Sequence, residues 1–196
     1  PAPVRAPAGA MVTTPFAERS AVTDAYLDAF RTMWTEPRPR IRGPSVSIDG
    51  PVVAPKPMQK PYPPIWVGGE SGPSMRRAAR VGDAWYPIGS NRGHLLDSLP
   101  RLEAGIGLLR RLVRDAGRDP WHVGVVYRVK RHAIAMPPAS DGNRRLFSGS
   151  IADTIEDIRA LRSIGVTGLD FDFERDDAEG VIAGMRKFRD DVVGRV

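Results

Sequence analysis

Two glycines at the carboxyl end of an apolar run are the residues of this sequence best placed to bind a ligand. The segment Ile65-Trp66-Val67 has the composition of a short strand, and Gly68-Gly69-Glu70-Ser71 follows it directly before a helix-like segment. Glycines let a backbone approach a ligand closely, and a helix N-terminus directs unpaired N–H groups and the positive end of its dipole at the same point. The pattern predicts a phosphate site; the alternative is a tight turn without a ligand.

Carboxyl side chains late in the chain form a second set that could do chemistry. Asp170, Asp172 and Glu174 alternate along one segment, so a strand would place them on one face. Carboxyl groups this close raise one another's pKa, as a general acid requires. The stretch resembles the active-site strand of chitinase-type glycosidases, in which Glu174 would protonate the leaving oxygen. The alternative is an acidic cluster at a strand end.

The remaining candidates for chemistry have simpler explanations. Asp83 is expected to cap a turn, and the histidines are too scattered in the sequence for a metal site, so no metal is predicted. Three aromatic residues at strand ends could stack on a ring, although packing in the core is the commoner role for such residues: Trp66, Trp85 and Tyr86.

Length and composition limit the class of protein. The chain has 196 residues, of which 41% are hydrophobic and 27% charged, which is typical of one soluble globular domain. No cysteine is present, so disulfides, thiolate metal sites and a cysteine nucleophile are excluded. The start of the sequence lacks the apolar region of a secretory leader, and no apolar run is long enough to cross a membrane. These features are compatible with a reducing cytoplasm, where we expect the protein.

The net charge of +6 raises nucleic acid as a partner, but the distribution of the charge argues against it. Arginines occur as scattered pairs with acids between them, and no aromatic residues are interleaved to stack on bases. We therefore expect solvated arginine faces and neither nucleic acid nor membrane as a partner.

The first third of the chain differs from the rest in composition and in its pattern of apolar residues. Residues 1–15 are rich in Pro and Ala, and are expected to be a disordered lead-in to a single domain over residues 16–196. Ser20 is the expected N-cap of a helix that ends before Pro37. Prolines then recur over residues 38–64, where alternation around Asp49-Gly50 predicts a hairpin excursion.

After Pro64, short strands alternate with helices, which is the signature of βα units on a parallel sheet. Ser150 and Asp153 form a capping-box pattern for the third of these helices, and Gly165 is its expected C′ residue. Four units are predicted, with strands over residues 65–67, 84–88, 123–136 and 166–173 and helices over residues 71–81, 95–117, 150–165 and 181–192. This is half of an eight-unit barrel, or a barrel whose first half is absent.

Several motifs in a fixed order resemble the middle of the luciferase-like monooxygenase family, which includes flavin-dependent and coenzyme F420-dependent oxidoreductases. They are Pro55-Lys-Pro-Met-Gln59, Pro61-Tyr-Pro-Pro-Ile-Trp-Val-Gly-Gly69, Arg77-Ala-Ala-Arg-Val-Gly-Asp-Ala-Trp85 and Pro87. A looser similarity extends from about Phe16 to Val193. Ala84 departs from the family pattern, which usually has a second glycine there.

The resemblance implies a partial (β/α)8 barrel, with the strands seen here as the fifth to eighth, and a cofactor bound at its C-terminal face. By analogy, the cofactor would be bound by Gly68, Gly69, Glu70, Ser71 and Met75. The substrate pocket would be bordered by Trp85, Ile88, Gly89 and Ser90. The cofactor would be coenzyme F420 or FMN, and arginine-rich, lysine-poor usage, typical of GC-rich bacterial genomes, favours F420.

The resemblance leaves two hypotheses of different kinds open. One is an oxidoreductase or monooxygenase acting on a small organic substrate. The other is a half-barrel remnant without redox chemistry, which would associate because it exposes two sheet edges and an apolar inner face. Its partner would be a second copy or a separate chain that completes the barrel.

Overall fold

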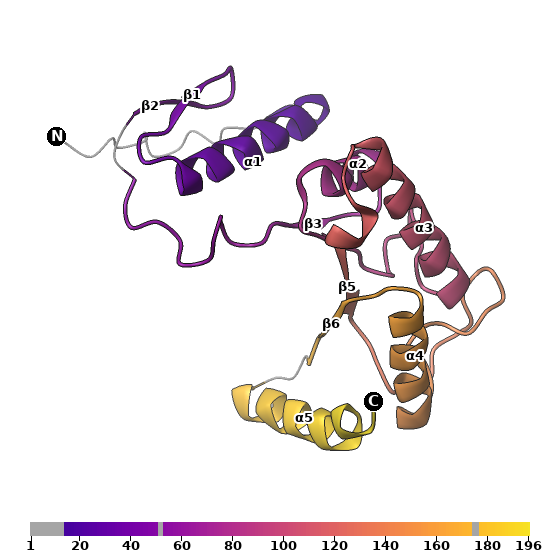
Figure 1. The fold of residues 1–196 in the computed structure, drawn as a ribbon. Helices are drawn as coiled ribbons and strands as arrows, with labels where there is room; N and C mark the ends of the chain where they lie inside the picture. The colour runs from indigo at the N-terminus through magenta and orange to yellow at the C-terminus, as the bar shows by residue number, and fades with distance from the viewer. Residues whose placement is uncertain (1–13, 51–52, 174–176) are drawn as a thin grey trace. The chain divides into compact units, whose positions relative to one another are not determined.

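The computed structural model describes residues 14–50, 53–173 and 177–196 (Figure 1). Most of the expected lead-in, residues 1–13, lies outside these described residues. The chain divides into two compact units, Pro1–Pro63 and Pro64–Val196. The boundary falls at the Pro63-Pro64 pair, where the texture of the sequence changes. The single domain over residues 16–196 stays a prediction.

The first unit contains one long helix and a small hairpin. A 3-10 turn, η1 (Phe16–Glu18), leads directly into α1 (Arg19–Thr35). Ser20 is therefore inside the helix, and its prediction as the N-cap is wrong: the N-cap position is Glu18, whose side chain makes no capping bond. The helix ends as predicted, because Glu36 precedes a proline and takes an extended backbone.

The hairpin exists, but its turn is not at the predicted place. β1 (Arg40–Arg42) pairs antiparallel with β2 (Ser47–Asp49), so residues 43–46 make the turn. Gly50 closes the open end of the hairpin, where its N–H bonds to the Pro39 carbonyl at 2.9 Å. A proline follows Gly50 in the sequence and, lacking an N–H, cannot donate to a ladder, which explains why pairing stops there.

The second unit confirms the four βα units. Its strands are β3 (Trp66–Gly68), β4 (Ala84–Tyr86), β5 (Gly124–Val129) and β6 (Gly168–Phe171). Its helices are α2 (Gly72–Val81), α3 (Leu99–Asp115), α4 (Ile151–Ser163) and α5 (Ala178–Asp191), with 3-10 turns η2 (Pro120–His122) and η3 (Val193–Arg195). The sheet order is β3-β4-β5-β6 with every pair parallel. This is the architecture of a partial (β/α)8 barrel.

Local signals set several boundaries. The capping box at Ser150 is confirmed, and Gly165 has φ +94° just after α4, as expected of a C′ residue. Several predicted elements are shorter than expected. α3 begins after Ser98 rather than at residue 95, and β4 ends at Tyr86 rather than at residue 88. β5 ends at Val129 rather than at residue 136, and β6 covers Gly168–Phe171 rather than residues 166–173. The residues after Val129 instead form a long loop that returns to α4.

The sheet has two different faces. On the helix-covered face, Val67, Trp85 and Val125 are buried, and a Cβ on Gly105 of α3 would lie 3.3 Å from the Trp85 ring. The other, inner face carries the alternate residues, from the 56% exposed Trp66 to Asp170. Among the described residues, β3 and β6 are each paired along one edge only.

The departure at Ala84 is accommodated on the inner face. Ala84 is buried opposite Gly124, and even a Cβ built on Gly124 would meet the Ala84 methyl at 3.6 Å, an ordinary contact.

Within the described ranges, no helix is long and apolar enough to cross a membrane.

Candidate cofactor and substrate site

The turn between β3 and α2 has the backbone that a ligand cradle needs. Gly69 has φ +99°, a conformation that residues with a side chain rarely adopt. A Cβ at this position would lie 2.8 Å from the Ser74 hydroxyl oxygen, so the turn has no room for a side chain here. Glycine therefore fixes both the shape of the turn and its closeness to the start of α2.

The start of α2 carries two serine hydroxyls that are hydrogen-bonded to each other. Ser71 occupies the N-cap position but makes no side-chain capping bond, and its hydroxyl lies 3.0 Å from that of Ser74. No acidic residue is present in the first turn, so an anion meets no repulsion from this segment. Two hydroxyls, the first amides of a ten-residue helix and the positive end of its dipole together suit a phosphate group.

Glu70 is a brace for the turn. Its side chain is buried, and its two carboxylate oxygens accept hydrogen bonds from the Ile88 backbone N–H at 2.7 Å and from the Asn91 side chain at 2.5 Å. Both donors belong to the loop after β4. Glu70 therefore ties the β3–α2 turn to the loop that was expected to border the substrate, while its role in contacting the cofactor stays a prediction.

Two further predicted residues lie in the core of the second unit. Trp85 is fully buried, and its indole N–H donates to the Gly69 carbonyl at 2.9 Å. Met75 is also buried, on the face of α2 that packs in the unit. The structure therefore brings Trp85 to the β3–α2 turn, through a hydrogen bond from the core side.

A cavity of about 340 Å³ lies at the carboxyl end of β5. Of the residues expected to border the substrate, Gly89 and Ser90 line it, whereas Ile88 and Trp85 do not. A Cβ on Gly89 would lie 2.0 Å from the Tyr127 hydroxyl, so only glycine fits at this point of the wall. The full lining is Gly89, Ser90, Asp97, Tyr127, Arg128, Val129, Lys130, Arg131, Met136, Arg145, Leu146 and Phe147.

Polar pairs occupy the inner face near the carboxyl ends of the strands. The Tyr86 hydroxyl donates to Asp170, and Arg128 binds both carboxylate oxygens of Asp172 at 3.0 Å. Burial and the neighbouring Asp170 raise the pKa of Tyr86 to about 12, so its hydroxyl is protonated at neutral pH. Asp170 and Asp172 share one face as predicted, but Glu174 lies outside the described residues.

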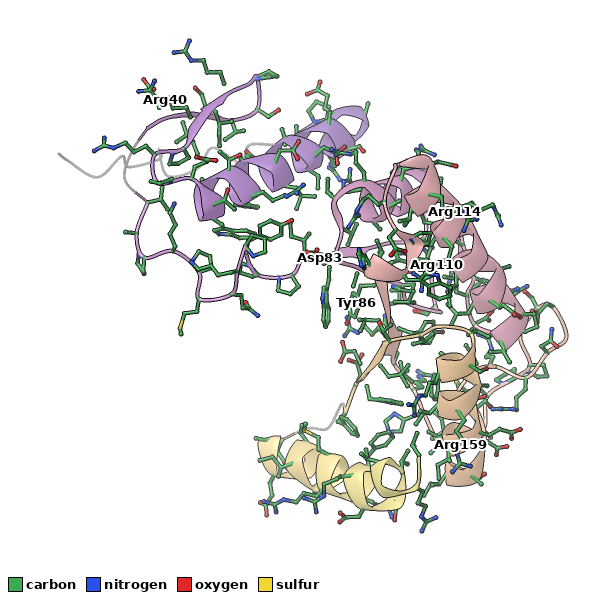
Figure 2. All side chains as sticks on the ribbon, viewed as in Figure 1. Arg40, Asp83, Tyr86, Arg110, Arg114 and Arg159 are labelled. Carbon is green, nitrogen blue, oxygen red and sulfur yellow. The ribbon has the colours of Figure 1, made fainter. Side chains whose placement is uncertain are left out.

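Asp83 accepts a backbone hydrogen bond, and one histidine is surrounded by aromatic rings. The Asp83 carboxylate, labelled in Figure 2, accepts the Ile65 backbone N–H at 2.8 Å, so it holds the start of β3, and its predicted turn-capping role stays a prediction. His132, for which no role was predicted, is enclosed by three aromatic rings at centroid distances of 5.1–5.3 Å, those of Phe171, Phe173 and Phe188.

Sequence reasoning missed the basic character of the cavity. Arg128, Lys130, Arg131 and Arg145 were expected on solvated faces, yet all four line one cavity. The available signal was position: residues 128–131 complete and follow a strand, and ligands of parallel α/β sheets bind beyond the carboxyl ends of strands. The expectation of a solvated side chain is wrong for Arg110 (labelled in Figure 2), which is buried and donates to the Val123 carbonyl at 2.8 Å.

Comparison with known proteins decides the family. The sequence profile described as luciferase-like monooxygenase matches residues 1–133, about two thirds of the chain. The chain belongs to this family. The turn between β3 and α2 lies inside the matched region. No curated protein matches the chain significantly.

Solved structures confirm the partial-barrel fold of this luciferase-like chain. An F420-dependent secondary alcohol dehydrogenase, solved with an F420-acetone adduct, is similar with a TM-score of 0.71 and 13% identity, over 95% of this chain and 65% of that one. A long-chain alkane monooxygenase is similar with a TM-score of 0.67 and 12% identity, over 93% of this chain and 58% of that one. The F420-dependent tetrahydromethanopterin reductase of Methanopyrus kandleri is similar with a TM-score of 0.62 and 13% identity, over 89% of this chain and 62% of that one.

The luciferase-like chain thus spans about 58–65% of the length of these structures. Neither the family match nor these structures supports the glycosidase alternative. Within the described residues, Asp170 and Asp172 have Tyr86 and Arg128 as partners.

Proposed function

We propose that this luciferase-like chain binds coenzyme F420 or FMN and takes part in oxidation or oxygenation of a small organic substrate in the bacterial cytoplasm. F420 is favoured by the arginine-rich composition and by two similar structures whose descriptions name that cofactor. FMN remains the alternative within the same site.

One observation carries the proposal: a glycine turn joined to an uncapped helix start. Gly69 leaves space where a side chain would collide with Ser74, and the Ser71 hydroxyl is not used to cap α2. This combination suits the phosphate that both cofactors carry. Gly68, Gly69 and Ser71 would hold that phosphate, and Glu70 would hold the turn in shape.

The chain's own residues would position and protect the reaction. A bound flavin or deazaflavin supplies hydride or oxygen chemistry, and the protein orients the cofactor and the substrate and excludes water from them. Tyr86, at the carboxyl end of β4, is a protonated donor held by Asp170. Apolar side chains of the cavity, such as Phe147, exclude water from the neighbourhood of the loop at Gly89.

Substitution Gly69→Asp tests the phosphate turn. It places a negative side chain where a phosphate would bind, and the new Cβ collides with Ser74. We expect saturable binding of F420 or FMN by the unaltered chain, measured by quenching of cofactor fluorescence, and a loss of at least about tenfold in affinity in the variant, or about 1.4 kcal/mol.

Gly117→Asp is the matched control. Gly117 also has positive φ, +71°, but lies after α3 with no atom within 4 Å of its Cβ position. It introduces the same charge and a similar backbone cost, so a folded Gly117→Asp protein should bind cofactor as the unaltered chain does. Equal binding by all three proteins, or no binding of either cofactor by the folded unaltered chain, would refute the proposal.

The exposed inner face favours a second candidate. Trp66 is 56% exposed, and a groove of about 650 Å³ runs along the inner face past Val126 and Gly168. A half-barrel with such a face would associate with a second copy or with a chain that completes the barrel. If the chain associates and binds neither cofactor, this remnant function replaces the first.

A further inference from the structure

The cavity beyond β5 has a strong excess of positive charge. Four of its lining residues are cationic, and one, Asp97, carries a carboxylate. Ligand cavities of this size commonly place a few charged groups on mainly apolar walls to orient a ligand. The sign of the charge therefore indicates the kind of ligand that fits.

Two of the four cations are neutralised by the protein itself. Arg128 binds Asp172 through both carboxylate oxygens at 3.0 Å. Arg145 contacts Asp97 at 2.8 Å, and Asp97 also accepts from Arg101 at 2.7 Å. These pairs shape the cavity, but their charge is already balanced.

Lys130 and Arg131 are different. Within the described part of the chain, neither forms an ion pair with a carboxylate, and both are exposed at the cavity. They follow Val129, the last residue of β5, so the strand fixes where they begin. The cavity thus holds two positive charges that the described protein does not balance.

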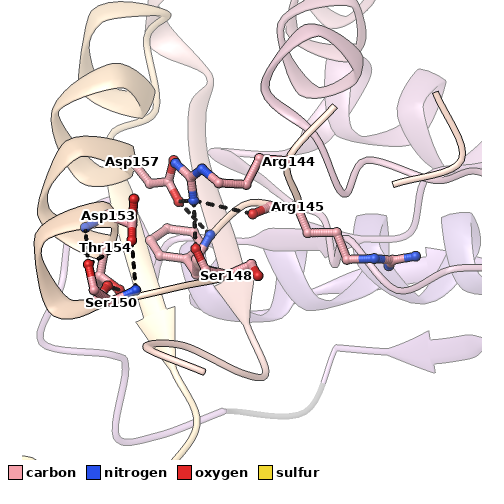
Figure 3. A network of polar contacts seen from close by, with 8 residues as sticks. Arg144, Arg145, Ser148, Ser150, Asp153, Thr154 and Asp157 are labelled. Carbon is pink, nitrogen blue, oxygen red and sulfur yellow. Dashed lines mark hydrogen bonds and ion pairs between the residues drawn. The ribbon is translucent and has the colours of Figure 1, made fainter. Parts of the chain in front are cut away.

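The wall of the cavity formed by Arg145, Leu146 and Phe147 is held in place by hydrogen bonds and an ion pair. Arg144 binds Asp157 of α4 at 2.9 and 2.5 Å, and the Phe147 backbone N–H donates to the same carboxylate at 2.5 Å (Figure 3). Asp157 is 5% exposed. This network fixes the segment that carries Arg145, Leu146 and Phe147, so two apolar side chains and one cation face the cavity in a set arrangement.

The cavity is joined to the phosphate turn. Gly89 and Ser90 line it, and Glu70 of the turn holds the same loop through Ile88 and Asn91. A ligand in the cavity would therefore lie beside the loop that the turn positions.

We propose that the cavity binds the anionic end of the substrate, a carboxylate or a phosphate, through Lys130 and Arg131. The apolar wall, with Leu146 and Phe147, would contact the carbon skeleton. The substrate class is then a small organic acid or phosphate ester. This inference rests on the proposed function in treating the cavity as the substrate site.

The test measures anion binding without cofactor. Succinate and pyrophosphate serve as probes for a carboxylate and a phosphate, titrated by calorimetry at low ionic strength against the full chain. Each protein is titrated in the unaltered sequence and again in the Gly69→Asp background, in which the turn does not bind the anion. Lys130→Gln/Arg131→Gln is compared with Arg111→Gln/Arg114→Gln, which removes the same charge from exposed positions of α3 outside the cavity.

We expect at least one probe to bind, and the Lys130→Gln/Arg131→Gln variant to lose about tenfold in affinity, because it removes both ion pairs to the anion. The α3 variant should stay within about twofold. Absence of binding of both probes, or equal losses in the two variants, would overturn the inference.

Cofactor titration of the same proteins separates the two proposals. Lys130→Gln/Arg131→Gln in the unaltered background should still bind F420 or FMN if the phosphate turn works. Anion binding retained by Gly69→Asp, with no cofactor bound by the unaltered chain, would support the cavity and refute the cofactor. The reverse result would support the cofactor and refute the cavity.

Discussion

At the scale of single residues, three buried or half-buried carboxylates of this chain act as braces. Glu70 ties two loops, Asp83 closes a turn onto Ile65, and Asp157 holds Arg144 and the Phe147 backbone. Each accepts backbone N–H groups that the sheet and helices leave unpaired. A buried carboxylate needs such donors, because without them its burial is costly.

Glu70→Ala should therefore destabilise the fold. The substitution removes two hydrogen bonds to a charged group and leaves the Ile88 N–H without its acceptor. Hydrogen bonds to charged groups contribute about 1.5–3 kcal/mol, so we expect a loss of about 2–3 kcal/mol in the free energy of unfolding, measured with urea.

Glu103→Ala, at an exposed position of α3, is the control and should change stability by less than about 0.5 kcal/mol. A Glu70→Ala protein as stable as this control would show that the brace contributes nothing.

At the scale of elements, α4 starts at a capping box that also sets a pH dependence. The Asp153 carboxylate accepts from Ser150, and these hydrogen bonds hold the pKa of Asp153 below its ordinary value of 3.8. A carboxylate with a lowered pKa stabilises the fold above its unfolded-state pKa, and the contribution is lost as the pH falls through the folded-state pKa.

Asp153→Asn should therefore be less stable than the unaltered protein near neutral pH, and the difference should shrink below about pH 4. Urea unfolding at several pH values measures this. Repeating the comparison in a Ser150→Ala background should flatten the pH dependence, since the principal cause of the shift is then gone. A difference that stays constant with pH would contradict this reading of the cap.

Local signals explain which elements could be predicted from sequence. The capping box, the C′ glycine Gly165 and the β3–α2 turn depend on neighbours within a few residues, and the sequence shows them directly. The hairpin turn was misplaced because Asp49-Gly50 has strong turn composition, whereas pairing with residues 40–42 decides the register.

Features of the candidate site that depend on residues far apart in the chain could not be predicted from the sequence. The cavity cations come together through the loop after β5, which the sequence pattern extended as a strand. The role of Glu70 depends on Ile88, eighteen positions away. Neither contact has a local signature in the sequence.

At the scale of the whole molecule, the second unit has one covered and one open sheet face. The helix side buries Trp85 completely, while Trp66 on the inner face is 56% exposed. Exposed aromatic surface beside strands paired along one edge favours association.

Trp66→Glu should weaken that association. A charge on the inner face opposes burial against an apolar surface, so sedimentation velocity should show a shift toward monomer relative to the unaltered chain. Trp121→Glu is the matched control, because Trp121 is 76% exposed and lies in η2, outside the sheet. An unaltered chain that stays monomeric at every concentration, or equal effects of both variants, would contradict the expectation.

The hydrogen bond from Trp85 to Gly69 also gives the protein an optical probe of its own. Of the four tryptophans, Trp85 alone among those described is fully buried, so we expect its emission to lie to the blue of the others and to resist iodide, which quenches exposed indoles. Its N–H ends on the carbonyl of the turn itself. Ligand binding at that turn can therefore be followed by the intrinsic fluorescence of Trp85, without an added dye.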